Sequence, residues 1–495
     1  MEDAVSELHD FLDSINADFG LNDRARQLIN FISKDDDEAF KLFSDLLIGK
    51  NIDQRHEMYA ARSHRAMYIL KEDITVSHSP IIIRTTEQAG LLAKELMAGL
   101  KHLTADSREY RTLHIRQVLD ALLESFPDKV LATASSGGSV GIQDHFAPLF
   151  LSPITLTFLT KLVCYGCTGR HGVASAEKSA QHTAMYQHQA FNNKISLGQR
   201  KKFVRQMVEF RLMERLAQTL GTSKSLEAGE EVCESILTIL EVVGYPPDDV
   251  AGASTKEYVM AGEDILFSPL GAAKWWQDML EIIQKQQQDT NANTYQMESI
   301  ARTLHSSFAL ASGNSSRICK SHAPATDATE QTSEKLVEEK EEKITNRLVE
   351  WGLTDKMYEA LLGQLPLLLR TIRLPEHDIL AFQATEFDTT KPELSPFIRH
   401  PGRYKTIPIG SWRLQLLSLL KEVVCYRNKE GNGKCAMDVI MDLPLSPELQ
   451  KGKKGKNVED DEEDNRESGE SLYNPWPAVS SIEFLFYLDF GKDRV

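Results

Sequence analysis

The fold class is decided by the stretch HPGRYKTIPIGSWRLQLLSLLKEVVCY, residues 400–426, which contains the clearest amphipathic helix of the chain. On a period of 3.6 residues, its apolar side chains share one broad face and its polar side chains lie opposite. The apolar face comprises Leu416, Leu417, Leu420, Val423 and Val424, and the polar face Gln415, Ser418, Lys421 and Glu422. A helix of this kind must bury its apolar face against neighbouring elements.

The entry to this helix carries an anomalous charge. Pro408 and Gly410 precede the helix, and Ser411 is expected to cap it. Arg413 projects from the first turn into the apolar face. An unpaired buried charge costs several kcal/mol, so the guanidinium must reach water past the helix end or pair with a carboxylate. We therefore interpret Arg413 as a snorkelling side chain, with a structural ion pair or a partner contact as the alternatives.

This stretch resembles a segment of the SAPS-domain family, the regulatory subunits of protein phosphatase 6. The family pattern P-[LI]-G-x-x-R-L-x-x-[VL]-x-L-L is matched by Pro408, Ile409, Gly410, Arg413, Leu414, Leu417, Leu419 and Leu420. Residues 203–220 and 228–236 are similar to a helix pair of the central SAPS domain, and the order of the two matches is right. The R-L and L-C-D-I/L elements of that pair correspond to Arg215-Leu216 and to residues 232–236, and residues 118–163 look like the preceding helix. The resemblance covers roughly residues 60–426.

The rest of the chain predicts an all-α protein. Alternation with period two is scarce before the C-terminus, whereas amphipathic helical segments follow one another with short connections. We predict helices over residues 23–32 and 36–48, from Thr85-Thr86 to Leu100, from Ser107 to Pro127, over 203–220, 232–243, 272–283 and 294–310, and over 344–369 with interruptions at Gly363 and Pro366. Helix pairs of similar size suit an α-solenoid, and the resemblance implies an armadillo/HEAT-like helical repeat.

The predicted domain organisation follows from the resemblance and from composition. We expect an N-terminal helical cap (1–60), SAPS-like helical repeats (60–311 and 344–449), a disordered insert (312–343), an acidic disordered loop (450–474) and a divergent C-terminal segment (475–495). In that last segment residues 482–486 resemble the family's L-D-L-F-F, but Asp489-Phe490-Gly491-Lys492 replace the expected asparagine pair. We therefore expect a divergent or a truncated member of the family.

Charge and cysteine usage exclude several function classes. A formal net charge of −16 over 495 residues disfavours sequence-independent binding to DNA or RNA, which relies on cations neutralising phosphates. The six cysteines are scattered and no signal peptide opens the chain, so we expect a reducing cytoplasmic or nuclear compartment. Residues 146–166 are the best candidate for a membrane span, but two prolines and Lys161 favour an internal helix and no span.

One constellation has spacing that could bind a metal. Cys164 and Cys167 form a C-x-x-C pair, with His182 and His188 downstream at intervals longer than those of a two-Cys, two-His zinc finger. We favour two ordinary cysteines at the end of an apolar helix and expect no cofactor. No phosphate loop, nucleophile elbow or dinucleotide fingerprint occurs in the sequence, which indicates a protein that is not an enzyme.

The resemblance implies a regulatory scaffold that binds a protein phosphatase 6-type Ser/Thr phosphatase catalytic subunit and directs its substrate choice. Ankyrin-repeat or substrate proteins would be further partners. Pro408, Gly410 and Arg413 are the residues we expect to shape or touch the interface. The alternatives are a HEAT-like transport or trafficking adaptor without a phosphatase and, less favoured, a zinc-dependent enzyme built on Cys164 and Cys167.

Overall fold

The structure, a computed structural model, is almost entirely helical. It describes residues 2–14, 39–49, 59–75, 82–83, 85–103, 108–136, 141, 144–168, 195–223, 225–245, 260–289, 293–314, 346–372, 398–399, 405–406, 411–426 and 435–442. The strands among them are β1 (Ile398–Arg399) and β2 (Lys405–Thr406), which pair antiparallel over two residues each. The described part of the chain is therefore all-α, as the sequence predicts.

The chain divides into two compact units. Unit 1 contains residues Met1–Pro269 and Gly313–Leu353, and unit 2 contains Leu270–Ser312 and Thr354–Val495. Several predicted segments lie outside the described residues: residues 315–343 of the predicted insert (312–343), the predicted acidic loop and C-terminal segment (450–474 and 475–495), and the helix predicted over 23–32. The bounds of the six predicted segments stay predictions.

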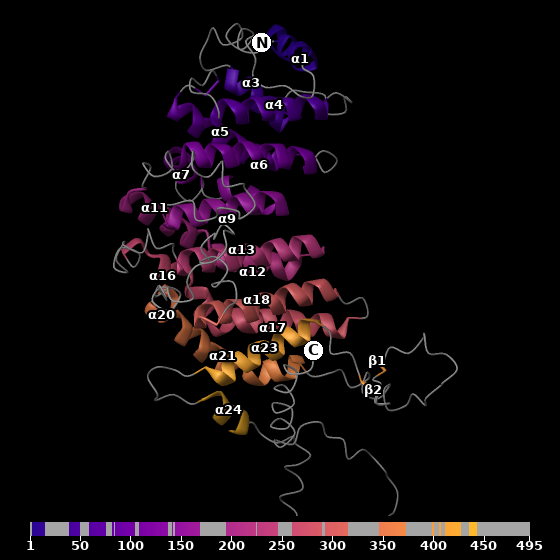
Figure 1. The fold of residues 1–495 in the computed structure, drawn as a ribbon, viewed down its shortest axis with the longest axis vertical. Helices are drawn as coiled ribbons and strands as arrows, with labels where there is room; N and C mark the ends of the chain where they lie inside the picture. The colour runs from indigo at the N-terminus through magenta and orange to yellow at the C-terminus, as the bar shows by residue number, and fades with distance from the viewer. Residues whose placement is uncertain are drawn as a thin grey trace, which may run out of the picture. The chain divides into compact units, whose positions relative to one another are not determined.

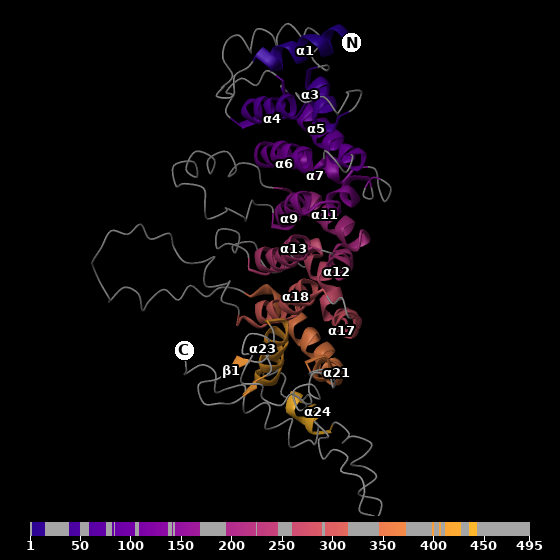
Figure 2. The ribbon, with the colours of Figure 1, turned by 90° about the vertical axis from the view of Figure 1, so that its right-hand side faces the viewer.

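Unit 1 is built from helices that pack in the order of the sequence. They are α1 (Glu2–Ser14), α3 (Ala39–Ile48), α4 (Tyr59–Thr75), α5 (Thr86–Gly99), α6 (Arg108–Ser125), α7 (Pro127–Ala134), α9 (Pro153–Thr168), α11 (Leu197–Glu209), α12 (Leu212–Thr222), α13 (Leu226–Gly244), α16 (Glu263–Leu266) and α20 (Arg347–Glu350), with the short 3-10 turns η1 (Leu100–His102) and η3 (Ala147–Phe150). Helix α4 packs on α6, α6 on α9 and α9 on α13 (Figures 1 and 2). In parallel, α5 packs on α7, while α11 contacts α9 and α12 contacts α13.

Local sequence signals set several of these helix ends. Thr85 Oγ1 accepts a hydrogen bond from the Gln88 amide at 3.2 Å, and Gln88 Oε1 accepts one from the Thr85 amide at 3.1 Å. This reciprocal pair gives hydrogen-bond partners to two of the backbone N–H groups that have no partner within the helix at its N-terminus. Pro127 occupies the first position of α7, and Phe126 alone separates it from the end of α6 at Ser125. The helix starting at Thr85-Thr86 and the stop before Pro127 are confirmed.

The helix predicted over residues 203–220 is broken into α11 and α12, so that prediction is wrong. Arg211 lies between them with a φ of 55°, in the left-handed region. The break buries the Phe210 ring, whose centroid lies 5.7 Å from that of Phe146, and Arg215 Nε donates to the Phe210 carbonyl at 2.8 Å. Burial of an aromatic ring is worth more than one strained residue, which costs about 1–3 kcal/mol.

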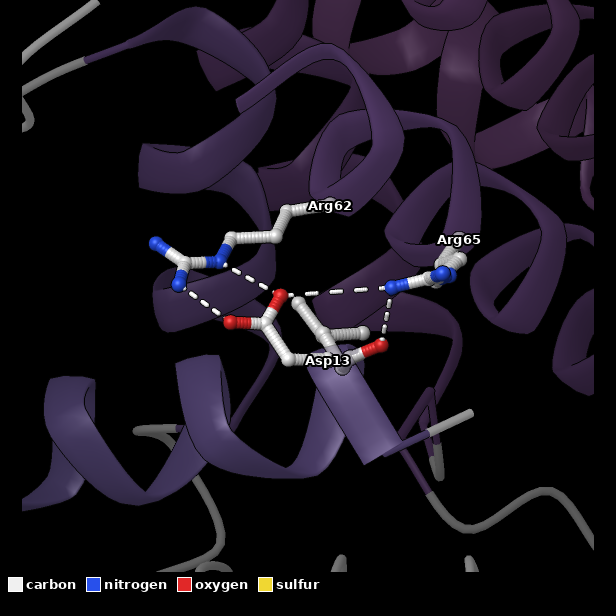
Figure 3. A network of polar contacts seen from close by, with 4 residues as sticks. Asp13, Arg62 and Arg65 are labelled. Atoms are coloured by element: carbon white, nitrogen blue, oxygen red, sulfur yellow. Dashed lines mark hydrogen bonds and ion pairs between the residues drawn. The ribbon is translucent and has the colours of Figure 1, made fainter. Parts of the chain in front are cut away.

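The N-terminal helix α1 docks on α4 through apolar and charged contacts. Leu8 and Leu12 of α1 are buried. Arg62 of α4 donates to both carboxylate oxygens of Asp13 (Figure 3). Arg65 Nη1 donates to the Leu12 carbonyl at 2.6 Å. The hydrogen bonds from Arg62 hold the pKa of the Asp13 carboxyl below its usual range. Arg65 thereby caps the C-terminal end of α1, where a cation also suits the helix dipole.

Unit 2 contains α17 (Ala273–Gln288), α18 (Thr294–Ser312), α21 (Leu353–Ile372, which begins at the last residue of unit 1), α23 (Ser411–Cys425) and α24 (Ala436–Asp442). A short 3-10 turn, η4 (Ser268–Gly271), precedes α17. Helix α18 packs along α23 and on α17. Thr354 Oγ1 donates to the Ala311 carbonyl at 2.7 Å, which ties the start of α21 to the end of α18.

The predicted interruptions at Gly363 and Pro366 do not occur, because α21 runs through both residues. Both lie on the exposed side of the helix. Proline removes the donor that would bind the Leu362 carbonyl, but on an exposed side water can bind that carbonyl instead. Exposure therefore lets the helix continue.

None of the described helices is both long and apolar enough to cross a bilayer. The best candidate from the sequence, residues 146–166, is divided between η3 and the 16-residue helix α9.

Candidate functional site

The first turn of α23 contains the one predicted partner-binding residue that the structure describes. Trp412 is buried, Arg413 is half-buried, and Leu414 is 53 % exposed. The Arg413 guanidinium carbon lies 4.3 Å from the centre of the Trp412 ring. A cation over an indole face gains about 0.5–1 kcal/mol at such a position, which explains how this face of the helix accommodates a charge. Pro408 and Gly410 lie outside the described residues.

The body of α23 buries four of the five side chains predicted for its apolar face. Leu416, Leu417, Leu420 and Val423 are buried, and so is Leu419, whereas Val424 and the polar residues Gln415, Ser418, Lys421 and Glu422 are partly exposed. The helix begins at Ser411 itself, so Ser411 is the first helical residue and not the cap. His305 Nδ1 of α18 donates to Gln415 Oε1 at 2.9 Å, which fixes the N-terminal half of α23.

The C-terminal end of α23 is fixed by an aromatic cluster. Tyr426 Oη donates to Asp355 Oδ1 of α21 at 2.8 Å, and the Tyr426 ring packs against Phe308 and Tyr358. Burial, and then the Asp355 carboxylate, raise the pKa of Tyr426. Tyr358 Oη in turn accepts from the amide of Ala436, at the start of α24. Helix α23 is thus held at both ends and presents Arg413 and Leu414 at its start.

The cysteine pair of the zinc hypothesis lies on α9. Cys164 and Cys167 are both completely buried and free of disulfides, and burial raises the pKa of both thiols. A raised pKa disfavours the thiolate that binds metals. His182 and His188 lie outside the described residues, and within the described residues no group of three or more potential ligands could hold a metal ion.

A buried charge pair was missed by sequence reasoning. Arg200 Nη2 lies 3.0 Å from Glu263 Oε1, and Arg200 Nε donates to the Cys167 carbonyl at 3.0 Å. Burial raises the pKa of Glu263 to about 7, although the positive charges of Arg200 and Arg347 lower it. The signal was present, because Arg200 precedes Phe203, Val204 and Met207 at helical spacing on the apolar face of α11. Since Glu263 is fully buried, its carboxylate fixes α16 to α11 rather than meeting a dissolved substrate.

A second missed cluster joins α4 and α6. Ser63 Oγ and His114 Nδ1 are hydrogen-bonded at 2.8 Å, and the His114 ring has edge contacts with His64 and Tyr110. Burial, and the neighbouring His64, lower the pKa of His114 to about 4. A neutral, buried imidazole of this kind is a packing group at neutral pH, and two histidines alone do not make a metal site.

Comparison of the chain with family models, with curated proteins and with solved structures finds no match in any of the three. Function therefore has to be argued from the residues and from the contacts described above.

Proposed function

We propose that this chain is a non-enzymatic scaffold that binds the catalytic subunit of a protein phosphatase 6-type Ser/Thr phosphatase and directs its substrate choice. The observation that carries the proposal is helix α23. Its sequence resembles the SAPS pattern, it is held at both ends within unit 2, and its first turn offers Arg413 and Leu414 to a partner. Arginine is one of the residues that protein interfaces favour at their centres, and the exposed leucine beside it adds apolar surface that a partner could bury.

The proposal includes a helical-repeat architecture of armadillo/HEAT type. The serial packing of α4, α6, α9 and α13 supports it, because helices of a solenoid bury their faces against sequence neighbours. A scaffold of this kind acts by recruitment. It raises the effective concentration of substrate near an active site that belongs to the bound phosphatase.

In this proposal the chemistry belongs to the partner, and the site of action is a reducing cytoplasmic or nuclear compartment. The sequence contains no phosphate loop, nucleophile elbow or dinucleotide fingerprint, and the groups with shifted pKa values, Glu263, His114 and Cys167, are buried. Their pKa shifts come chiefly from burial, as in packed structural groups, and not from a cleft open to substrate.

The test is capture of a phosphatase by the full chain. The tagged chain is incubated with cell lysate, and the retained proteins are identified by mass spectrometry; binding is then repeated with the purified catalytic subunit. We expect retention of a Ser/Thr phosphatase catalytic subunit and its loss with Leu414→Asp. Leu91→Asp is the matched control, because Leu91 of α5 is 50 % exposed and belongs to unit 1.

Two results would contradict the proposal. One is retention of transport cargo or coat components without any phosphatase, which would favour the trafficking adaptor. The other is a phosphatase that binds the wild type and Leu414→Asp equally, which would remove α23 from the interface.

A further inference from the structure

The α11–α16 region of unit 1 combines exposed cations with exposed large apolar side chains. Lys201, Lys202 and Arg205 of α11 are exposed, and within the described part of the chain they take part in no ion pair. Ile265 of α16, which packs on α11, is 52 % exposed, and Met260, three residues before α16, is 50 % exposed. We call these five residues the α11–α16 surface.

The two halves of this surface are adjacent. A Cβ built at Gly262 would lie 3.8 Å from Val204 Cγ1 of α11 and 3.8 Å from Ile265 Cδ1. Val204 and Ile265 therefore border the same small space. Lys201 precedes Val204 by three residues, and residues three apart are neighbours on a helix surface. Lys201 thus lies next to this space, and Arg205, four residues further on, is its neighbour on the helix surface.

The two helices of this surface are joined by a buried ion pair. Arg200 of α11 pairs with Glu263 of α16, and both side chains are buried. Gly262 has a φ of +92°, a conformation that favours glycine, and it sets the turn from which Ile265 projects. A preorganised surface binds a partner without first having to order itself.

The α11–α16 surface is positively charged, whereas the chain as a whole is negatively charged. Apart from the buried Arg200–Glu263 pair, the described residues of α11 and α16 carry three cations and two carboxylates, Glu209 and Asp264, which leaves a positive balance of one. The chain as a whole carries a formal charge of −16. A positive patch on an acidic protein selects acidic partners, and apolar side chains beside it select partners that also carry large apolar groups.

From this complementarity we propose that the α11–α16 surface docks an acidic peptide segment that carries large apolar side chains. The acidic groups of the segment contact Lys201, Lys202 and Arg205, and its apolar side chains contact Met260 and Ile265. The surface is a second docking site, and it does not depend on a phosphatase being the partner of α23.

The test uses the full chain and a fluorescein-labelled dodecapeptide that alternates Asp-Glu pairs with Leu-Phe pairs. Fluorescence anisotropy measures its binding to the wild type, to Lys201→Glu with Arg205→Glu, and to Met260→Ser with Ile265→Ser. We expect each double variant to weaken binding about tenfold or more, because each charge reversal replaces attraction by repulsion and each serine removes apolar contact. Lys94→Glu and Leu91→Ser, exposed residues of α5, are the matched controls and should leave binding unchanged.

Two further peptides separate the contributions. Replacing the acids by Asn and Gln, or replacing Leu and Phe by Ala, should each abolish binding. Thermal unfolding checks that every variant is folded, and Lys201→Gln with Arg205→Gln replaces the charge reversal if that variant unfolds.

Three outcomes would overturn the proposal. They are no binding of the acidic–apolar peptide to the wild type, equal binding by wild type and both double variants, and binding that needs only the charges. A last experiment measures binding of the chain to phosphatidylcholine vesicles that contain phosphatidylserine. Vesicle binding that is lost in Lys201→Glu with Arg205→Glu, without peptide binding, would assign the surface to a membrane instead.

Discussion

Arg200 and Glu263 form an ion pair inside unit 1, with 3.0 Å between Nη2 and Oε1 and with only 8 % and 0 % of their side chains exposed. The pair connects α11 to α16 across 63 positions of sequence. Burial opposes the charge on Glu263 more strongly than the two nearby arginines favour it, so its pKa rises from 4.5 to about 7.

This pKa shift predicts how stability depends on pH. Between pH 4.5 and about 7 the folded state binds more protons at Glu263 than the unfolded state does, so the contribution of this group to the free energy of unfolding falls as the pH rises. The loss is about 1–3 kcal/mol. Thermal unfolding at several pH values should therefore show the stability of the wild type relative to Glu263→Gln decreasing from pH 5 to 7. Parallel curves would contradict this; Glu209→Gln, exposed on α11, is the control.

For His114 we predict the opposite dependence of stability on pH, in a pH range that overlaps with that of Glu263. Its pKa is about 4 in the folded protein and 6.5 ordinarily, so between these values the unfolded state binds more protons. Stability from this group is therefore lost as the pH falls from 6.5 to 4. His114→Asn, which retains an acceptor toward Ser63, should flatten that part of the curve. His64→Ala should raise the pKa of His114 in an NMR titration, because a neighbouring positive charge is removed.

Two helical glycines should respond in opposite ways to alanine. A Cβ at Gly166 would lie 2.4 Å from ring atoms of the buried Phe203, whereas a Cβ at Gly363 would meet nothing within 4 Å. Gly166→Ala should therefore destabilise by about 1–3 kcal/mol through overpacking. Gly363→Ala should stabilise by about 0.5–1 kcal/mol, because alanine favours the helix. Urea unfolding of both variants checks the contrast, and a shift in the same direction for both would refute it.

Signals that act within a few residues could be predicted from the sequence. The reciprocal hydrogen bonds at the start of α5 can be predicted from Thr85 and Gln88 alone. The buried face of α23 can be predicted from the helical period of its own sequence. The break at Arg211 could not be predicted in this way, because it depends on Phe210 packing against Phe146, 64 positions earlier in the chain.

The same limit applies to the candidate sites. The sequence shows that both Arg413 and Arg200 lie on an apolar helix face, but it does not show which group stabilises each charge. Arg413 stacks on its own neighbour, Trp412, whereas Arg200 pairs with Glu263, a residue that no local pattern connects to it. Helical periodicity therefore predicts which charged residue is buried, whereas its partner can be identified only from the folded structure.

Tyr426 should contribute to the rigidity of α23. Tyr426→Phe keeps the ring between Phe308 and Tyr358 but removes the hydrogen bond to Asp355. A hydrogen bond to a charged group contributes about 1–3 kcal/mol, and we expect the low end of this range because both groups are partly exposed. Thermal unfolding measures the loss. An unchanged midpoint would mean that the hydroxyl does not stabilise α23.

Arg413 allows the structural and the partner-binding interpretation to be separated. Arg413→Leu keeps apolar contact with Trp412 and removes the charge. If Arg413 touches the phosphatase, capture should weaken about tenfold while the melting temperature stays close to that of the wild type, because the lost cation–π contact is small. A lower melting temperature with capture intact would instead make Arg413 a structural residue. If neither quantity changes, the side chain only snorkels to water. Lys421→Leu, also partly exposed on α23, is the control for removing a charge from the same helix.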